Sequence, residues 1–356
     1  MRTRQLVTLL SSVAFVPACQ TADEHPLPEE IARPAGTEFE GPAFEFEEVV
    51  QGVYHARGTG ELAVGSHGAV IVNEDDVLLV ESHISPAAAW AVVEEIEALT
   101  DKPVRFVVNT HFHFDHAHGN GIYPPEVQVI GHEVTREMIE SGASMGRSYQ
   151  LFLGGLPDQV AALEERVATA EDEEERTELQ GRLDYARNYL EGQRDLVPNG
   201  PNATLSERMT LHRGEREIQL LFFGRGHTGG DVVVYLPRER VLVTGDLLVP
   251  GLPFMGDGFI AEWDDTLERL KALDFDWILP GHGNPFRDKE RISYLQEYMR
   301  DLQAQAEALH AEGLTYEEAA ARIDMSSHGE RYPQIAGTGV PAVTVQRIFE
   351  LLESGG

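Results

Sequence analysis

The densest group of residues able to do chemistry is the heptapeptide THFHFDH at residues 110–116. It places three imidazoles and one carboxylate within six residues: His111, His113, Asp115 and His116. Neutral imidazole and carboxylate are ligands of Zn²⁺ and of other borderline first-row cations. A single histidine is normally a packing residue, but this spacing as a unit predicts a metal site.

Three shorter motifs carry further ligand-type side chains. GHTGGD at 226–231, TGD at 244–246 and PGHG at 280–283 each follow or separate predicted strands. Their glycines allow backbone and cation to approach closely. Taken singly, His227 could be an ordinary loop histidine and Asp246 could cap or pair at a strand end. Together and in this order, the motifs predict that His227, Asp246 and His282 share one site with residues 110–116.

The elements that must position these residues are strands in runs, punctuated by helices. Apolar runs predict strands at 49–54 (with a turn at Gly52), 69–72, 77–80, 104–109, 127–130, 218–223, 232–235, 240–244 and 277–279. Helical spacing and a Ser-Pro start predict helices at 85–98, 264–273, 288–311, 315–323 and 341–353. This order indicates two packed sheets with helices on their outer faces.

Residues 133–196 interrupt the strand pattern. Leucines and other apolar residues recur there at three- and four-residue spacing among charges, as in amphipathic helices. The acidic run at 171–175 is read as a solvated helix face or turn. We therefore expect a helical insertion that serves as a lid or a dimer contact.

Composition narrows the function classes. The chain has 356 residues, with 28 Lys+Arg against 60 Asp+Glu and a formal net charge of −32. A length of this order allows one large or two medium domains. Nucleic acid is excluded as a partner, because phosphate binding needs a basic surface. Cys19 is the single cysteine, which excludes an internal disulfide framework and a zinc site built from several thiolates.

The four motifs in this order resemble those of the metallo-β-lactamase superfamily, and within it those of the glyoxalase II-like hydrolases. The resemblance covers about residues 46–290 and is far more specific for the fold than for the substrate. It implies an α/β fold, the αββα sandwich, which agrees with the two packed sheets inferred above. The domain would span 46–356, with a helical insertion at about 133–196 and a C-terminal helical extension at about 288–356.

Carried over residue by residue, the resemblance implies two metal ions per chain, expected to be Zn²⁺ with Fe or Mn as alternatives. His111, His113 and His227 would hold the first ion. Asp115, His116 and His282 would hold the second, and Asp246 would bridge the two. Paired cations about 3.5–4 Å apart make hydroxide from water at neutral pH. That hydroxide would attack an ester, thioester, lactone or lactam carbonyl, and Asp115 would act in catalysis by steering it or passing a proton to the leaving group.

Supporting residues are expected around the ligands. Thr110, Thr228, Asp231 and Thr244 are candidates to orient ligands through hydrogen bonds. Glu81 stands where relatives commonly carry an aspartate, and it is expected to support the metal loop from behind.

Other residues have an ordinary interpretation beside a functional one. His118 stands where the family often has glycine, and we expect it at the surface. Tyr149, Phe152, Met255 and Trp263 are candidates to line a pocket, although most aromatic residues belong to a core.

Three classes of function stay open. The first is a metal-dependent hydrolase acting on a small molecule. Within it, a β-lactamase is an alternative, although β-lactamases of this fold generally carry cysteine or serine in place of Asp246. The second is an oxidoreductase, since persulfide dioxygenases resemble this motif set and bind a single iron. The third is a non-enzymatic binding platform, and the filled ligand positions argue against it. Oligomeric state is left open.

The N-terminus indicates export. Arg2 and Arg4 precede an apolar run at 6–16, which is too short to span a bilayer and matches a secretory signal peptide. The sequence VPAC at 16–19 resembles a bacterial lipobox, so residues 1–19 are read as a signal peptide whose Cys19 becomes lipidated; a plain cleaved signal is the alternative. Residues 20–45 are read as a flexible tether. We expect a protein anchored by lipid in the bacterial cell envelope, and Gln20 favours the outer membrane.

Overall fold

The computed structural model describes residues 31–194 and 196–355. The predicted signal peptide and lipobox at 1–19, and residues 20–30 of the predicted tether, lie outside the described residues. Within the described ranges, no helix combines the length and the apolar character needed to cross a bilayer.

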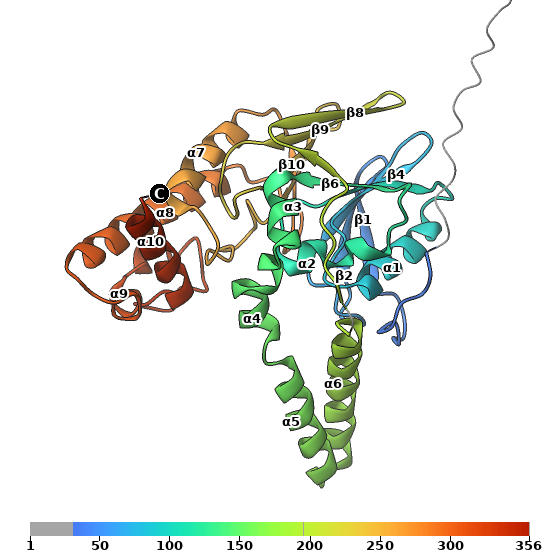
Figure 1. The fold of residues 1–356 in the computed structure, drawn as a ribbon, viewed down its shortest axis with the longest axis horizontal. Helices are drawn as coiled ribbons and strands as arrows, with labels where there is room; N and C mark the ends of the chain where they lie inside the picture. Colours follow the sequence, from blue (N-terminus) through green and yellow to red (C-terminus); the bar gives the residue numbers. More distant parts are fainter. Residues whose placement is uncertain (1–30, 195, 356) are drawn as a thin grey trace, which may run out of the picture.

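Two β-sheets form the centre of the molecule (Figure 1). The first has the order β1-β2-β3-β4-β5-β6-β7 and the second the order β12-β11-β10-β9-β8. The strands of the first sheet are β1 Phe44–Val50, β2 Val53–Gly58, β3 Gly68–Val72, β4 Val77–Val80, β5 Val104–Val108, β6 Gln128–His132 and β7 Ala203–Leu205. The strands of the second are β8 Arg208–Arg213, β9 Arg216–Phe222, β10 Val232–Leu236, β11 Val241–Gly245 and β12 Trp277–Pro280.

The sheets pack against each other through alternate side chains of their strands. In β10, Val232 and Val234 point into a core shared with Ile71 and Leu78 of the first sheet, while Val233 points to the opposite face. Successive side chains of a strand alternate between faces, so a strand covered on both sides is apolar throughout. All five residues of β10 are accordingly buried.

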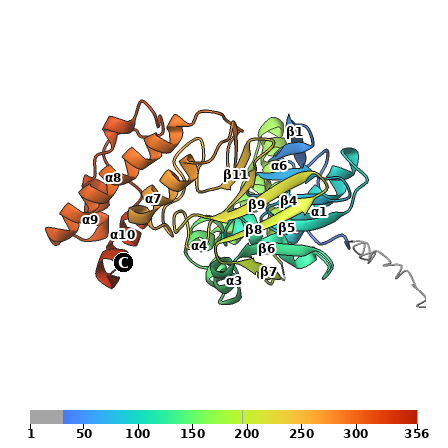
Figure 2. The same cartoon turned by 90° about the horizontal axis from the view of Figure 1, so that it is seen from above.

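Helices cover the outer face of each sheet (Figure 2). Ala88 and Val92 of α1 pack on Val70 and Leu79 of the first sheet. Helices α7 and α8 cover the second sheet, and helices α9 and α10 join the same apolar core. The helix bounds are α1 Pro86–Glu95, α2 Phe114–Ala117, α3 Glu133–Glu140, α4 Arg147–Leu153, α5 Leu156–Thr169, α6 Glu173–Gly192, α7 Ile260–Lys271, α8 Glu290–Ala311, α9 Tyr316–Arg322 and α10 Ala342–Ser354. Short 3₁₀ turns are η1 Ile96–Ala98, η2 His118–Ile122, η3 Ala143–Met145 and η4 Ser326–His328. The predicted αββα sandwich with C-terminal helices is confirmed.

Strand direction decides where loops meet. Strands β4, β5, β6 and β7 run parallel, as do β11 and β12. Ligand sites of α/β sheets form outside the carboxyl ends of parallel strands. Those ends carry residues 109–116 after β5, Asp246 after β11 and His282 after β12.

The predicted helical insertion is confirmed as helices α3 to α6. Helices α5 and α6 form a hairpin that projects from the body (Figure 1), and its buried residues make a cluster of their own, separate from the sheet cores. The acidic run opens α6: the side chain of Asp172 accepts a hydrogen bond from the Glu175 amide, and Glu173 to Glu175 occupy the first turn, where negative charge is favourable.

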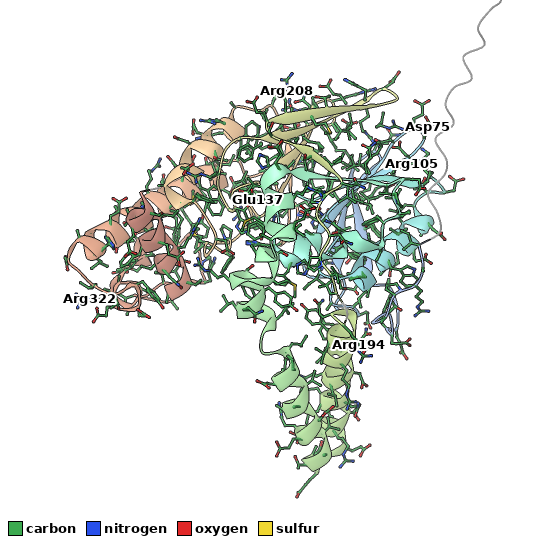
Figure 3. All side chains as sticks on the ribbon, viewed as in Figure 1. Asp75, Arg105, Glu137, Arg194, Arg208 and Arg322 are labelled. Carbon is green, nitrogen blue, oxygen red and sulfur yellow. The ribbon has the colours of Figure 1, made fainter. Side chains whose placement is uncertain are left out.

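Charge is distributed over the exterior. Asp75, Arg208 and Arg322 are exposed and lie at the periphery in Figure 3. Side chains of both charge signs are thus solvated at the periphery, while Asp76, Glu81, Asp231 and Asp246 are buried.

The N-terminal part of the described chain differs from the expectation. Residues 31–43 were assigned to the tether, yet Thr37 is 3% exposed and the Arg33 guanidinium lies over Trp90. The amides of Ala43 and Phe44 donate to the Glu95 carboxylate, so this segment is tied to the domain. Strand β1 also begins before the predicted position, and β7 and β8 were not predicted.

Candidate metal centre

The seven predicted ligands converge from four loops on one end of the sandwich. His111 and His113 come from the turn that joins β5 to α2, and Asp115 and His116 lie in α2 itself. His227 comes from the loop between β9 and β10. Asp246 and His282 follow β11 and β12. His111, His113, His116 and His227 are at most 3% exposed, while Asp115 and His282 are partly exposed. The structure brings all seven together, and their role as metal ligands stays a prediction.

Three imidazole nitrogens form the first cluster. His111 Nε2 lies 3.0 Å from His113 Nδ1, and His227 Nε2 lies 2.9 Å from the same atom. Nitrogens bound at 2.0–2.1 Å around a tetrahedral zinc ion would be about 3.3 Å apart. The observed spacing is close to this value, so the cluster fits a cation.

The second cluster contains two carboxylates and two imidazoles. Asp115 Oδ2 lies 3.1 Å from His282 Nε2 and 3.4 Å from His116 Nε2. Asp246 Oδ2 lies 3.4 Å from His282 Nε2 and 3.6 Å from His227 Nε2 of the first cluster. The Asp246 carboxylate thus contacts both clusters, as a bridging ligand would.

Four atoms of the predicted ligands are buried without a hydrogen-bond partner: His116 Nδ1, His116 Nε2, His227 Nδ1 and Asp246 Oδ1. Of these, His116 Nε2 and Asp246 Oδ1 face each other at 3.6 Å. Buried polar atoms are nearly always satisfied. A cation coordinated by both atoms would satisfy them, which is a second sign that the residues fit a metal.

Hydrogen bonds behind the ligands select the ring nitrogens that face the centre. Thr110 Oγ1 donates to Glu81 Oε1 at 2.5 Å, so it accepts the proton of His111 Nδ1 at 2.9 Å. His111 Nε2 is then free to coordinate. The predictions for Thr110 and Glu81 as supporting residues agree with this geometry.

Glu81 also forms a group with His111 and His116 that has the spacing of metal ligands. Its carboxylate already accepts hydrogen bonds from the Thr110 amide and hydroxyl. It faces His116 Nδ1 at 3.1 Å, while His116 Nε2 faces Asp115. We therefore place Glu81 behind the ligands.

Burial and charge shift the pKa values of the centre in opposite directions. Burial lowers the pKa of His111 well below its usual value, and the neighbouring imidazoles His116 and His227 lower it further. Burial raises the pKa of Asp246, but the charges of His282 and His116 outweigh it and hold that pKa well below its usual value. Burial lowers the pKa of His282, but Asp246 and Asp115 outweigh it and raise that pKa to about 10. The aspartates are therefore ionised at neutral pH.

Asp257 is a functional candidate that sequence reasoning missed. His113 Nε2 lies 3.1 Å from Asp257 Oδ2, so this carboxylate accepts the Nε2 proton and leaves His113 Nδ1 free to coordinate. Burial raises the pKa of Asp257, but the hydrogen bond to His113 and the charge of Arg147 outweigh it and lower that pKa. The available signal was the glycine-flanked aspartate of Gly256-Asp257-Gly258.

Asp257 connects the centre to both helical additions. Arg147 at the start of α4 lies 4.0 Å from Asp257 Oδ1, donates to the Gly256 carbonyl and forms a two-pronged ion pair with Glu350 of α10 at 2.6 and 2.8 Å. The insertion and the C-terminal helices therefore brace the carboxylate behind His113.

Replacing Asp257 with asparagine is expected to weaken divalent-cation binding by about ten- to a hundredfold, because the amide no longer holds His113 through a charged acceptor. Competition with a chromophoric chelator measures this affinity without any substrate. Asp265→Asn, at an exposed position of α7, is the matched control. Equal affinity in both variants and the wild type would show that Asp257 does not position His113.

Several secondary predictions are wrong. Asp231 accepts from the Thr228 amide and hydroxyl, so the pair shapes the loop and does not contact the His227 ring. Thr244 donates to the Leu248 carbonyl and not to Asp246. His118, expected at the surface, is fully buried beside Ser144.

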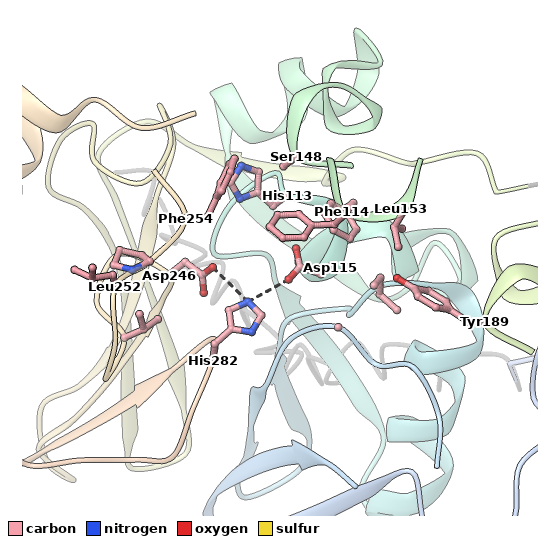
Figure 4. A pocket seen from close by; sticks show the side chains of 15 residues that line it. His113, Phe114, Asp115, Ser148, Leu153, Tyr189, Asp246, Leu252, Phe254 and His282 are labelled. Carbon is pink, nitrogen blue, oxygen red and sulfur yellow. Dashed lines mark ion pairs between the residues drawn. The ribbon is translucent and has the colours of Figure 1, made fainter. Parts of the chain in front are cut away.

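A cavity of about 460 Å³ opens onto the centre. Figure 4 shows His282 between Asp246 and Asp115, with Leu153 and Tyr189 to one side. Apart from the site residues, the lining is mostly apolar: Ile84, Phe114, Phe152, Leu153, Tyr189, Val249, Leu252, Pro253 and Phe254. Among the described residues that line it, none is lysine or arginine.

The pocket candidates separate into two groups. Phe152 lines the cavity, as predicted. Met255 and Trp263 instead belong to the core beneath α7, and Tyr149 packs edge-on against Phe114 at 5.6 Å.

Comparison with known proteins agrees with this geometry. Residues 63–282, more than half of the chain, match the family model described as the metallo-beta-lactamase superfamily. A linear primary-alkylsulfatase from Pseudomonas sp. (strain ATCC 19151) is 25% identical over 265 residues, covering 71% of this chain and 49% of that protein. A metallo-beta-lactamase type 2 from Elizabethkingia meningoseptica is 26% identical over 118 residues, covering 31% of this chain and 47% of that protein. The chain thus spans about half the length of these curated relatives.

Among solved structures, a double mutant of the sec-alkyl sulfatase PisA1 superimposes with a TM-score of 0.61 at 17% identity, covering 88% of this chain and 50% of that one. Likeness at this identity supports the fold alone.

Proposed function

Because the chain belongs to the metallo-β-lactamase superfamily, we propose that it is a dinuclear, metal-dependent hydrolase with two zinc ions per chain. The observation that carries the proposal is the pair of ligand clusters joined by Asp246, whose carboxylate lies within 3.6 Å of His227 and 3.4 Å of His282. Each cluster has enough nitrogen and oxygen donors for one cation.

Two cations held by these residues would supply hydroxide at neutral pH and polarise the carbonyl oxygen of the substrate. Asp115 and Asp246 both line the cavity and lie within 3.4 Å of His282 Nε2. Because Asp246 contacts both clusters, Asp115 is the carboxylate left for proton transfer. As a carboxylate, Asp115 would accept the proton of the attacking oxygen and pass that proton to the leaving group.

The lining of the cavity favours an uncharged scissile group. No lysine or arginine is among its described residues, so neither of these side chains is available to pair with an anionic head group. The carbonyl of an ester, thioester, lactone or lactam needs no such side chain. The negative charge that develops on its oxygen would be stabilised by the metal ions. We therefore propose carbonyl hydrolysis.

A sulfate ester is the second candidate. It is favoured by the alkylsulfatase relative, which covers 71% of this chain, whereas the β-lactamase relative covers 31%. The negative charge of a sulfate ester would have to be neutralised by the two cations alone. A mononuclear iron oxidoreductase acting on persulfides is the remaining alternative.

One experiment separates these functions. The metals of the protein as purified are counted by mass spectrometry. The purified and the zinc-loaded protein are then assayed on octyl esters, octanoyl thioesters, lactones, β-lactams, octyl sulfate and a persulfide. We expect two zinc ions per chain and turnover of a carbonyl substrate. Turnover of octyl sulfate alone would replace carbonyl hydrolysis with sulfate-ester hydrolysis. A single iron, with sulfite formed from a persulfide, would overturn the hydrolase.

We also propose that the protein works in the cell envelope, anchored through a lipid on Cys19. Expressed with its N-terminus in a Gram-negative host, the wild type is expected in the membrane fraction and to incorporate labelled palmitate. Cys19→Ala is expected to lose the label and leave the membrane fraction. A variant that stays membrane-bound would contradict the anchor.

A further inference from the structure

The cavity at the metal centre continues into a second one along the helical hairpin. The second cavity, of about 560 Å³, lies between α4, α5 and α6. Phe152, Leu153 and Tyr189 line both cavities. The two cavities therefore adjoin at these side chains, and they lie in sequence from Asp115 and Asp246 to the middle of the hairpin.

The groove extends well beyond the shared residues. On α5 it is lined from Leu156 to Leu163, and on α6 from Tyr189 back to Gly181. At a rise of 1.5 Å per residue, these stretches add about 10 and 12 Å of length. The groove is thus elongated along the hairpin, which suits an extended chain.

The groove presents apolar side chains to solvent. Phe152 is 59% exposed and Tyr185 is 42% exposed, and both line it. Large apolar side chains exposed along a groove commonly mark a binding surface. The polar lining residues Gln159 and Arg182 lie in the hairpin part, away from the site residues of the first cavity.

Gly181 keeps the groove open at its far part. It lies inside α6 and lines the groove, and a Cβ built on it would meet nothing within 4 Å. Glycine in a helix interior is less favourable than alanine, and packing gives no reason for it here. Any larger side chain at this position would project into the space that the groove occupies.

We infer that the substrate carries a long, unbranched aliphatic chain. The position of its reacting bond rests on the proposed function. Its scissile group sits at the metal centre. Its chain passes Phe152, Leu153 and Tyr189 and lies in the groove between α5 and α6. The helical insertion is the part of the protein that selects chain length.

The test measures binding, so it does not depend on turnover. Butanoate, octanoate and dodecanoate are titrated into the zinc-loaded full chain by calorimetry. Wild-type Kd is expected to fall by about fourfold for each added methylene that reaches the groove. In Gly181→Phe, the ring fills the far groove: Kd for dodecanoate is expected to rise at least about tenfold, and Kd for butanoate to stay within about twofold.

Two further variants keep the result interpretable. Asp184→Phe adds the same ring to the same helix at an exposed position that lines neither cavity, and it is expected to bind like the wild type. Tyr185→Ser, at a half-exposed position, is expected to raise Kd for dodecanoate and to leave Kd for butanoate unchanged. This variant tests the groove even if Gly181→Phe does not fold.

The outcomes separate this inference from the proposed function. Wild-type affinity that does not depend on chain length, or equal weakening of short and long chains in Gly181→Phe and Tyr185→Ser, overturns the groove. Chain-length-dependent binding with no hydrolysis of any alkanoyl ester, thioester or lactone leaves the groove and overturns carbonyl hydrolysis. Hydrolysis of short esters with no preference for chain length overturns the groove and supports carbonyl hydrolysis.

Discussion

Replacing Asp246 with alanine is expected to lower kcat/KM by about a thousandfold or more and to reduce the bound metal below two ions per chain. The Asp246 carboxylate contacts both clusters, at 3.6 Å from His227 and 3.4 Å from His282. Paired cations supply several kcal/mol of transition-state stabilisation, and each 1.4 kcal/mol is a factor of ten in rate. Loss of the bridge removes that contribution.

The measurement combines steady-state kinetics with metal counting on the same samples. His113→Ala removes the imidazole whose Nδ1 lies 3.0 Å from His111 Nε2 and 2.9 Å from His227 Nε2, and it is expected to act as strongly. Asp265→Ala, at an exposed site of α7, controls for the loss of one carboxylate, and circular dichroism confirms folding. Full activity with two metals retained in both Asp246→Ala and His113→Ala would refute the metal mechanism.

Replacing Trp263 with alanine is expected to cost about 3–5 kcal/mol of unfolding free energy, the usual range for a buried aromatic side chain. Trp263 is 0% exposed, and its indole Nε1 donates to the Leu247 carbonyl at 3.1 Å. Its ring also packs against His227, with 5.6 Å between centroids. The space left by the substitution would therefore lie directly behind His227, a candidate metal ligand.

Urea unfolding followed by circular dichroism measures the loss. Trp263→Phe retains a ring and is expected to lose less, although it leaves the Leu247 carbonyl without its donor. Both variants are compared after metal removal, so that weaker cation binding does not contribute. A loss below about 1 kcal/mol in Trp263→Ala would contradict the assignment of this residue to the core.

The sequence was most informative where chemistry and local spacing coincide. His111, His113, Asp115 and His116 lie within six residues of the chain, so their convergence needs no knowledge of distant contacts. His227, Asp246 and His282 could be placed with them because each is next to a strand end, and parallel strands bring such ends together.

What escaped prediction depends on contacts between distant parts of the chain. Asp257 reaches His113 across 144 residues, and Arg147 reaches Glu350 across 203. His118 is buried by Ser144, which belongs to the insertion. Neither local spacing nor hydrophobic period carries information about such pairs. The described part of the predicted tether was misread for the same reason, because Arg33 finds Trp90 only in the folded chain.

The separate apolar cluster of the α5–α6 hairpin has a consequence for protein engineering. Leu156, Leu163, Leu179 and Leu183 stabilise the hairpin from within, whereas Arg147 of the preceding helix α4 belongs to the bracing of His113. We therefore expect that the length of the hairpin can be changed beyond α4 while the loops that carry the predicted ligands keep their sequence. With the groove proposed above, such a change would alter the chain length that is bound and leave the predicted metal centre as it is.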